Sequence, residues 1–297
     1  MNKISKIIFA CICVFGLWSL PAYATEAVFN YVYTTDLLPK GEMEVEQWIT
    51  DREKQAHGHY HNLEMRTELE YGITDNLTLS GYLNYSYLNA HNNSVLRDTS
   101  GLDIPANHDP ARAFNDLRFD TFSAELIYRL LSPYKDPLGL AVYVEPEYGP
   151  RERAIEFRVI AQKNFLDDRM IFAANIWSEL EREEAGGGEI ERATMLETDL
   201  GLTYRFAPKW FAGVEYRNHN EYEGYTISHD DQEHTANFIG PVIHYASQNW
   251  WATLTVLRQF YAVGFNDEQK DNIVNDKIYG DEHTLYDGIR FKVGISF

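Results

Sequence analysis

The chain has 297 residues, a formal net charge of −19 at neutral pH, and an aromatic content of 14% that includes 20 tyrosines and 6 tryptophans. So negative a surface repels the phosphates of nucleic acid and attracts cations, which excludes the first class of partner and favours the second. The aromatic content is more typical of strands than of helices.

Residues 1–24 predict a secretory signal peptide. Lys3 and Lys6 precede an apolar run over 7–20, and Ala22-Tyr23-Ala24 then supplies the small residues of a cleavage site. The apolar run is shorter than the roughly 20 residues that a membrane-spanning helix needs. We expect cleavage after Ala24 and export to the periplasm.

Both cysteines of the chain, Cys11 and Cys13, fall within this peptide. A lipoprotein signal at Cys11 is the competing interpretation, but the apolar run continues well past that residue. Cleavage after Ala24 would leave a mature chain that can form no disulfide and no zinc–thiolate site.

Residues 25–41 are harder to place. Val28, Tyr31 and Val32 resemble strand residues, but the segment has no partner in an even count of strands. Three interpretations remain open: a periplasmic lead-in, a plug inserted into a barrel, or an additional strand.

From residue 42 onward the dominant pattern is alternation. Leu77, Leu79, Leu83, Tyr85 and Tyr87 share one parity, and small polar residues occupy the other. A period of two predicts a strand with one apolar and one polar face. The preceding segment alternates in the same way and is separated from this one by a short turn, which is typical of a β-hairpin.

Similar segments recur to the end of the chain. We predict twelve strands, over 43–52, 60–73, 77–88, 117–131, 138–149, 153–165, 169–182, 192–206, 210–222, 234–245, 250–261 and 284–297. Most of them reach the roughly 9 to 11 residues that a tilted transmembrane strand needs. Pro146 and Pro241 fall inside two of them, where we expect bulges or shifted boundaries because proline cannot donate to a sheet.

The connections between these segments alternate between short turns and longer polar loops. Alternate connections of a meander emerge at opposite ends, and short turns at one end with long loops at the other are typical of outer-membrane barrels. An unpaired edge in hydrocarbon would leave backbone groups without partners, so the sheet is expected to close. The predicted fold class is all-β: a transmembrane antiparallel up-and-down β-barrel of about twelve strands over 42–297.

Aromatic residues are concentrated beside the short turns and at the chain end, where a girdle at the membrane interface is expected. The last segment places apolar residues at every second position and ends on Phe297. With the signal peptide and the alternating strands, this ending resembles the Gram-negative outer-membrane β-barrel proteins, in a porin-like group without an assigned activity. The resemblance implies a location in the outer membrane, contact with its lipid, and recognition of the last strand by the barrel-assembly machinery.

If the apolar faces contact lipid, the charged residues of the other parity line the lumen, because ions on the lipid face are costly. The predicted lumen residues are Glu64, Arg66, Glu68, Glu70, Glu125, Arg129, Glu145, Glu147, Glu156, Arg158, Glu197, Asp199, Arg205, Glu215, Arg217, Arg290 and Lys292, with Glu44 and Glu46 on the same face. Such a lining suits an aqueous pore that prefers cations, or an interior filled by salt bridges. A barrel of twelve strands is larger than the small barrels that side chains fill and smaller than the porins that hold a water channel, so the strand count does not decide between the two interpretations.

Histidines at 57, 59 and 61 give a second candidate site. At period two, His57, His59 and His61 would lie on one side of a strand, within reach of a shared Zn²⁺ or Cu²⁺. The alternative is a set of solvated loop histidines. No serine–histidine pair falls at the outer end of a strand with an evident third partner, so the chain is not expected to be an enzyme, and no cofactor is expected.

These patterns favour a passive channel for small polar solutes, cationic or neutral. The alternative is a closed surface-binding or structural barrel whose outer loops bind metal ions or a partner.

Overall fold

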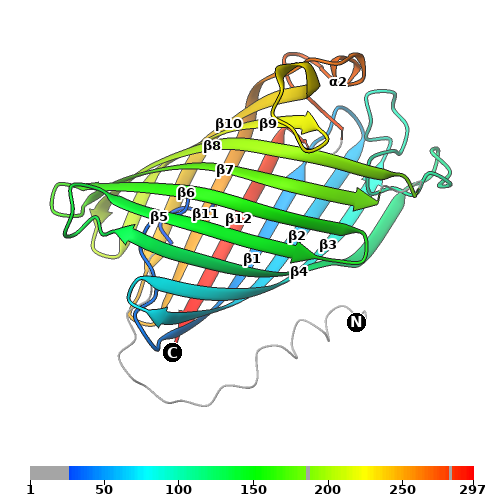
Figure 1. The fold of residues 1–297 in the computed structure, drawn as a ribbon. Coiled ribbons are helices and arrows are strands. Elements are labelled where there is room, and N and C mark those ends of the chain that lie inside the picture. Colours follow the sequence, from blue (N-terminus) through cyan, green and yellow to red (C-terminus); the bar gives the residue numbers. More distant parts are fainter. Residues whose placement is uncertain (1–26, 185–187, 281–282) are drawn as a thin grey trace, which may run out of the picture.

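A computed structural model of the chain describes residues 27–184, 188–280 and 283–297. The predicted signal peptide lies outside these residues. The described chain forms one closed antiparallel barrel of tilted strands (Figure 1). Among the described residues, no helix combines the length and the apolar character that crossing a membrane requires.

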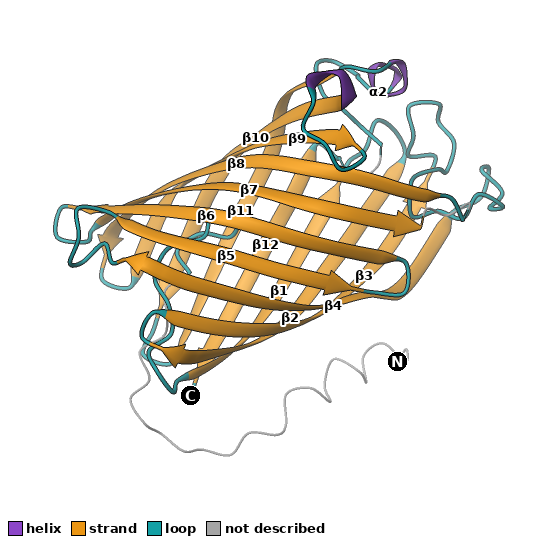
Figure 2. Cartoon of the chain, in the orientation of Figure 1, coloured by secondary structure: helices purple, strands orange, loops and turns teal. Residues whose placement is uncertain are grey.

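The predicted all-β barrel of twelve strands is confirmed. The strands are β1 (Met43–Glu53), β2 (His59–Thr74), β3 (Leu77–His91), β4 (Phe114–Leu131), β5 (Gly139–Tyr148), β6 (Glu152–Phe165), β7 (Met170–Glu184), β8 (Ile190–Ala207), β9 (Trp210–Glu223), β10 (Gln232–Ala246), β11 (Trp250–Gly264) and β12 (Tyr286–Ser296). A 3₁₀ turn, η1 (His229–Asp231), and a short helix, α2 (Asp267–Asp271), lie in two of the longer loops (Figure 2).

Strands β1 and β12 close the barrel. Their register pairs Val45 with Ile295 and Ile49 with Phe291. Beyond the last strand residue, the backbone N–H of Phe297 donates to the carbonyl of Met43 at 2.9 Å. The alternating C-terminal segment is therefore held to its last residue by hydrogen bonds to the first strand.

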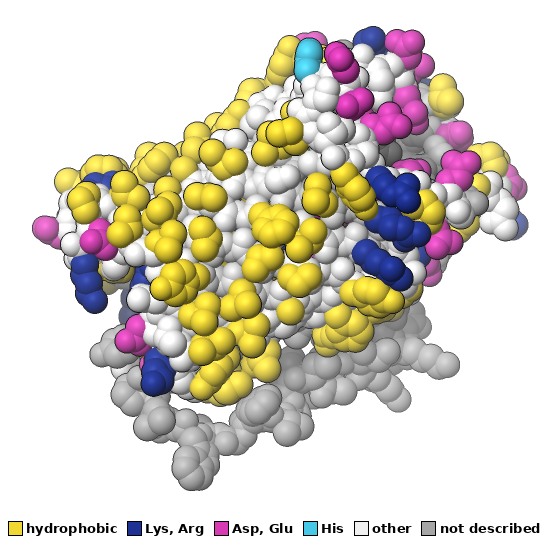
Figure 3. Space-filling view, viewed as in Figure 1, with side chains coloured by type: hydrophobic (Ala, Val, Ile, Leu, Met, Phe, Trp, Pro, Cys, Tyr) yellow, Lys and Arg dark blue, Asp and Glu magenta, His cyan; other side chains and the backbone are white. Residues whose placement is uncertain are grey.

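The exterior of the barrel is apolar. In the face seen in Figure 3, hydrophobic side chains cover the wall and charged side chains gather toward its two ends. The aromatic side chains that flank the short turns are exposed on this exterior, as a girdle requires. They are Tyr71, Tyr128, Tyr204, Phe206, Trp210, Trp250 and Phe297.

Two prolines inside strands do not produce the bulges or shifted boundaries that we expected. Pro146 lies in β5 and Pro241 lies in β10. The register continues unshifted past each of them, but the ladder toward one neighbouring strand has no pair at the proline. Both rings point outward, and the gap in each ladder spans two residue pairs and leaves the strand path unchanged.

Residues 27–38 fill the interior of the barrel, and the exposed Pro39 and Lys40 lead from them toward β1. Val28, Phe29, Asn30, Thr35 and Leu38 are each at most 2% exposed. The segment adds no strand to the closed sheet, and its backbone is held by side chains of the wall. We call residues 27–38 the plug segment; it is the dark blue trace inside the barrel in Figure 1.

Candidate functional site

The plug segment is anchored by one carboxylate, that of Glu215 in the middle of β9. Its Oε1 accepts the backbone N–H of Asn30 at 3.1 Å, and its Oε2 accepts those of Tyr31 and Val32 at 2.7 and 3.1 Å. Thr255 on β11 donates its hydroxyl to the same group at 2.5 Å. These hydrogen bonds replace the contacts with water that the carboxylate and the plug backbone lose when they are buried.

Two amide side chains continue this role along the plug. Asn175 accepts the N–H of Tyr33 at 2.6 Å and donates to its carbonyl at 2.9 Å. Gln162 accepts the N–H of Thr35 at 2.7 Å. The plug therefore binds the wall through backbone groups, with the wall supplying side chains in place of a neighbouring strand.

Three predicted lumen bases bind the carbonyls of the plug. Arg290 donates to Asn30, Arg158 to Tyr31 and Arg129 to Thr35, over 3.2 to 3.4 Å. The guanidinium of Arg290 also lies 3.9 Å from the centre of the Tyr31 ring. These bases stabilise the plug by hydrogen bonds and cation–π contact.

Small residues in the wall make room for the plug's aromatic rings. A Cβ on Gly201 would lie 2.6 Å from the ring of Phe29, and a Cβ on Gly288 would lie 1.6 Å from the hydroxyl of Tyr31. Any larger residue at either position would displace the plug ring that lies against it.

An acidic pocket separates the plug from strands β1 to β4. It has a volume of about 70 Å³. Glu46, Glu68, Glu70 and Glu125 line it together with Lys292. Tyr82 donates to Glu125 at 2.6 Å and to Glu68 at 2.9 Å, while Tyr33 of the plug reaches Glu125 at 3.3 Å. Carboxylates therefore outnumber bases along this side of the plug.

Elsewhere in the lumen, acids and bases pair. Arg66 contacts Glu145, Arg158 contacts Glu156 at 2.8 Å and Asp199 at 3.5 Å, and Arg217 contacts Glu197 at 2.5 Å. Glu64 bonds to Arg52 at 2.6 Å, and Glu147 accepts from Thr121 at 2.9 Å. Arg205 lines a recess at the short-turn end with Phe211. In the acidic pocket, by contrast, the carboxylates outnumber the one base that lines it, Lys292.

Toward the long-loop end the lumen opens into a vestibule of about 900 Å³. Acidic residues from four strands and α2 line it: Glu181, Glu183, Glu191, Glu221, Glu223, Glu233 and Glu268. In the nearby loop between β3 and β4, a hydrogen bond from Ser94 lowers the pKa of Asp98 below its ordinary value. The vestibule therefore has a strongly negative surface.

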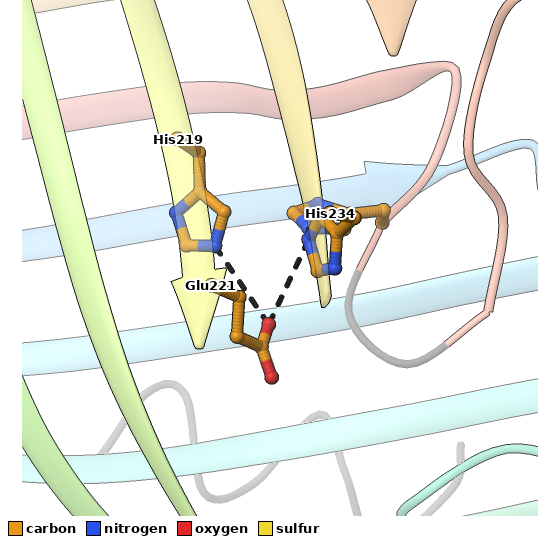
Figure 4. A group of neighbouring side chains, drawn as sticks. His219, Glu221 and His234 are labelled. Carbon is orange, nitrogen blue, oxygen red and sulfur yellow. Dashed lines mark hydrogen bonds and ion pairs between the residues drawn. The ribbon is translucent and has the colours of Figure 1, made fainter. Parts of the chain in front are cut away.

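Four possible metal ligands meet at the base of this vestibule. His219 and Glu221 belong to β9 and His234 to β10, and these three side chains converge in Figure 4. His283, from the loop before β12, completes the group, in which all four ligand atoms lie within 4.8 Å of one another.

The three histidines predicted as a metal site lie in different surroundings. His59 and His61 lie on β2 with their ring centres 4.8 Å apart, whereas His57 precedes the strand. His61 instead lies near Asp51 and Glu53. Among the described residues, no group of close ligands combines the three.

Sequence patterns gave no grouping of His219, Glu221, His234 and His283. A sequence signal exists for three of them. His219 and Glu221 are two residues apart on the lumen side of one predicted strand, and His234 begins the strand that follows it. Grouping these three also requires the register of β9 with β10, which sets Glu221 opposite His234.

Comparison with curated proteins gives no match to this chain. Many solved structures resemble the barrel, and two of them have a TM-score of 0.50. An outer membrane channel from Pseudomonas putida F1 has a TM-score of 0.50 and 12% identity, covering 88% of this chain and 96% of that one. The translocator domain of the autotransporter NalP from Neisseria meningitidis has a TM-score of 0.50 and 9% identity, covering 89% and 90%.

At these identities the likeness concerns the fold alone, which is that of outer-membrane channel and translocator barrels. The match to a family model is more direct and spans nearly the whole chain. The chain belongs to the family of unknown function DUF6662, whose model matches residues 21–297.

Proposed function

We propose that this protein is an outer-membrane channel that its own plug segment keeps closed, and that small cations cross it along the acidic pocket when the plug moves. In this proposal the chain is exported to the periplasm and assembled into the outer membrane. It acts by passive diffusion and catalyses no reaction.

The observation that carries the proposal is the way in which the plug is bound. Its backbone is held by single side chains such as Glu215, Asn175 and Gln162. A strand added to the sheet would be held by a continuous ladder of backbone hydrogen bonds. A segment held by separate side-chain contacts can leave without opening the wall. Local opening of such a segment needs far less free energy than unfolding of the barrel.

The acidic pocket supports the choice of solute. Glu46, Glu68, Glu70 and Glu125 face the plug on one side, and the vestibule above it is also rich in carboxylates. Rings of acidic side chains favour cations in pores. The channel also admits neutral polar solutes and disfavours anions.

Planar-bilayer recording tests the proposal. We expect the full mature chain to show small or rare conductance steps, and a variant lacking residues 27–38 to show large, cation-selective steps under a salt gradient. Replacing Glu46, Glu68 and Glu125 by Gln in the shortened variant should move the reversal potential toward zero.

A shortened variant that is folded, as judged by heat-modifiable migration on gels, but passes no current at any voltage would overturn the channel. That outcome would favour the second candidate, a closed surface-binding barrel. The filled interior and the large acidic vestibule are the observations that favour this alternative.

A further inference from the structure

We propose that His219, Glu221, His234 and His283 form a binding site for one divalent transition-metal ion of the zinc class, at the base of the outer vestibule. The site is separate from His57, His59 and His61, and it does not depend on whether the barrel conducts.

The fold brings these residues together from two strands and a loop. His219 and Glu221 are two residues apart on β9, so both side chains point to the same face of the strand. In the adjacent strand β10, His234 is paired with Glu221. His283 returns to this point from the loop between β11 and β12, where its N–H donates to the carbonyl of Gly280 at 2.9 Å.

The ligand atoms converge on one point. The Oε2 of Glu221 lies 3.9 Å from Nε2 of His219 and 3.7 Å from Nε2 of His234. The Nε2 atoms of His234 and His283 are 2.7 Å apart. Ligands of a tetrahedral zinc ion lie about 3.3 Å from one another, given bonds of about 2.0 to 2.1 Å to nitrogen. Shifts of roughly half an ångström would therefore admit an ion.

Two of the rings carry a buried nitrogen that makes no hydrogen bond. Among the described residues, the Nδ1 atoms of His234 and His283 accept or donate no hydrogen bond, although the two residues are 0% and 5% exposed. Buried polar groups are normally satisfied. Two imidazole nitrogens at 2.7 Å must also share one proton between them if no ion is bound. A cation between the four groups removes that restriction.

A carboxylate behind the ring of His219 orients it as in known zinc sites. The Nδ1 of His219 lies 2.9 Å from Oε2 of Glu197, which fixes its Nε2 toward the other ligands. Arg217 in turn holds Glu197 at 2.5 Å. Asp287 lies 3.7 Å from Nδ1 of His283 and is held by Arg52 at 3.3 Å. Histidine ligands of zinc commonly donate from their second ring nitrogen to a carboxylate, as His219 is placed to do toward Glu197.

The donor set selects the class of ion. Three imidazoles and one carboxylate suit Zn²⁺ and its neighbours among the transition metals, whereas Ca²⁺ and Mg²⁺ prefer oxygen ligands alone. His219, Glu221 and His283 all line the acidic vestibule. An ion therefore has a direct route from outside the cell in the proposed orientation.

Isothermal titration of the purified barrel in detergent with ZnCl₂, after treatment with a chelator, tests the site. We expect one ion per chain, and binding at least about 100-fold weaker in His234→Ala and in His283→Ala. Titration with Co²⁺ should give the intense visible absorption of a tetrahedral site in the parent protein and lose it in both variants. The double change of His59 and His61 to Ala, and the change of the exposed His229 to Ala, are the controls and should keep the parent affinity.

Because His283 lies in a loop, its variant tests the site even if a change in β10 disturbs folding. Heat-modifiable migration on gels verifies that each variant is a closed barrel. A parent protein that binds no Zn²⁺, a His283→Ala variant that binds it as tightly as the parent, or loss of binding in the His59/His61 control would each overturn the assignment.

Discussion

At the scale of single residues, Glu215 is the strongest link between plug and wall, because one carboxylate accepts three backbone N–H groups. Glu215→Gln replaces one of its oxygens by a donor that faces these N–H groups. An unsatisfied buried donor costs about 1 to 3 kcal/mol, so hydrogen exchange within residues 27–38 should accelerate by roughly 10- to 100-fold. Glu147→Gln, on a carboxylate that bonds only within the wall among the contacts seen here, is the control; equal exchange in both variants would contradict the anchor.

A second residue-scale prediction uses the space left by glycine. In Gly288→Ala, the new Cβ would lie 1.6 Å from the hydroxyl of Tyr31, so the ring must move away from the wall. A cysteine placed at Thr34 should then react faster with a maleimide than it does in the parent barrel. Gly81→Ala is the matched control, because a Cβ there meets nothing within 4 Å. Equal labelling rates in the two variants would show that the fit at Gly288 does not hold the plug.

At the scale of elements, alternation alone located all twelve strands, with ends that differ by no more than a few residues. A strand buried on one face by lipid must keep a strict period of two, so the pattern is long and clear. The same rule placed the charged residues of β9, including Glu215 and Arg217, on the lumen side. It gave no position for residues 25–41, because a segment held by side chains needs no periodic pattern.

The metal ligands illustrate the same limit. Period two predicts that His219 and Glu221 share a face, but the approach of His283 depends on the path of a loop of about twenty residues between β11 and β12. The histidines at 57, 59 and 61 lie close together in the sequence and form a more visible pattern than ligands that are far apart in it. Long-range convergence is therefore the part of the site that only the fold supplies.

The closing strand leads to a prediction about assembly. The backbone of Phe297 pairs with Met43, while its ring is 46% exposed at the rim. Phe297→Ala should leave the closing hydrogen bonds in place, so refolding in detergent should give the parent yield. If assembly factors recognise the Phe297 ring, the fraction of heat-modifiable protein in the outer membrane of cells should fall severalfold. Parallel losses in detergent and in cells would instead indicate a structural role.

At the scale of the whole molecule, the barrel reverses the arrangement of a water-soluble protein: its charges lie inside and its apolar side chains outside. Leu200 on β8 is 36% exposed and points outward, opposite in parity to Asp199. The exposed aromatic residues Tyr204 and Phe206 follow it toward the short-turn end. With a girdle at these two residues, a span of about 9 to 11 residues places Leu200 near the middle of the bilayer.

Leu200→Arg therefore tests the orientation of the entire wall. An arginine facing lipid near the midplane should lower the free energy of unfolding by about 2 to 4 kcal/mol, measured by denaturant titration of the barrel refolded into lipid vesicles. Leu96→Arg is the control, since Leu96 is 84% exposed in the loop between β3 and β4 and should tolerate the charge. Equal stability of the two variants would mean that water, and not lipid, surrounds the apolar exterior, and the proposals that need a membrane would fall with it.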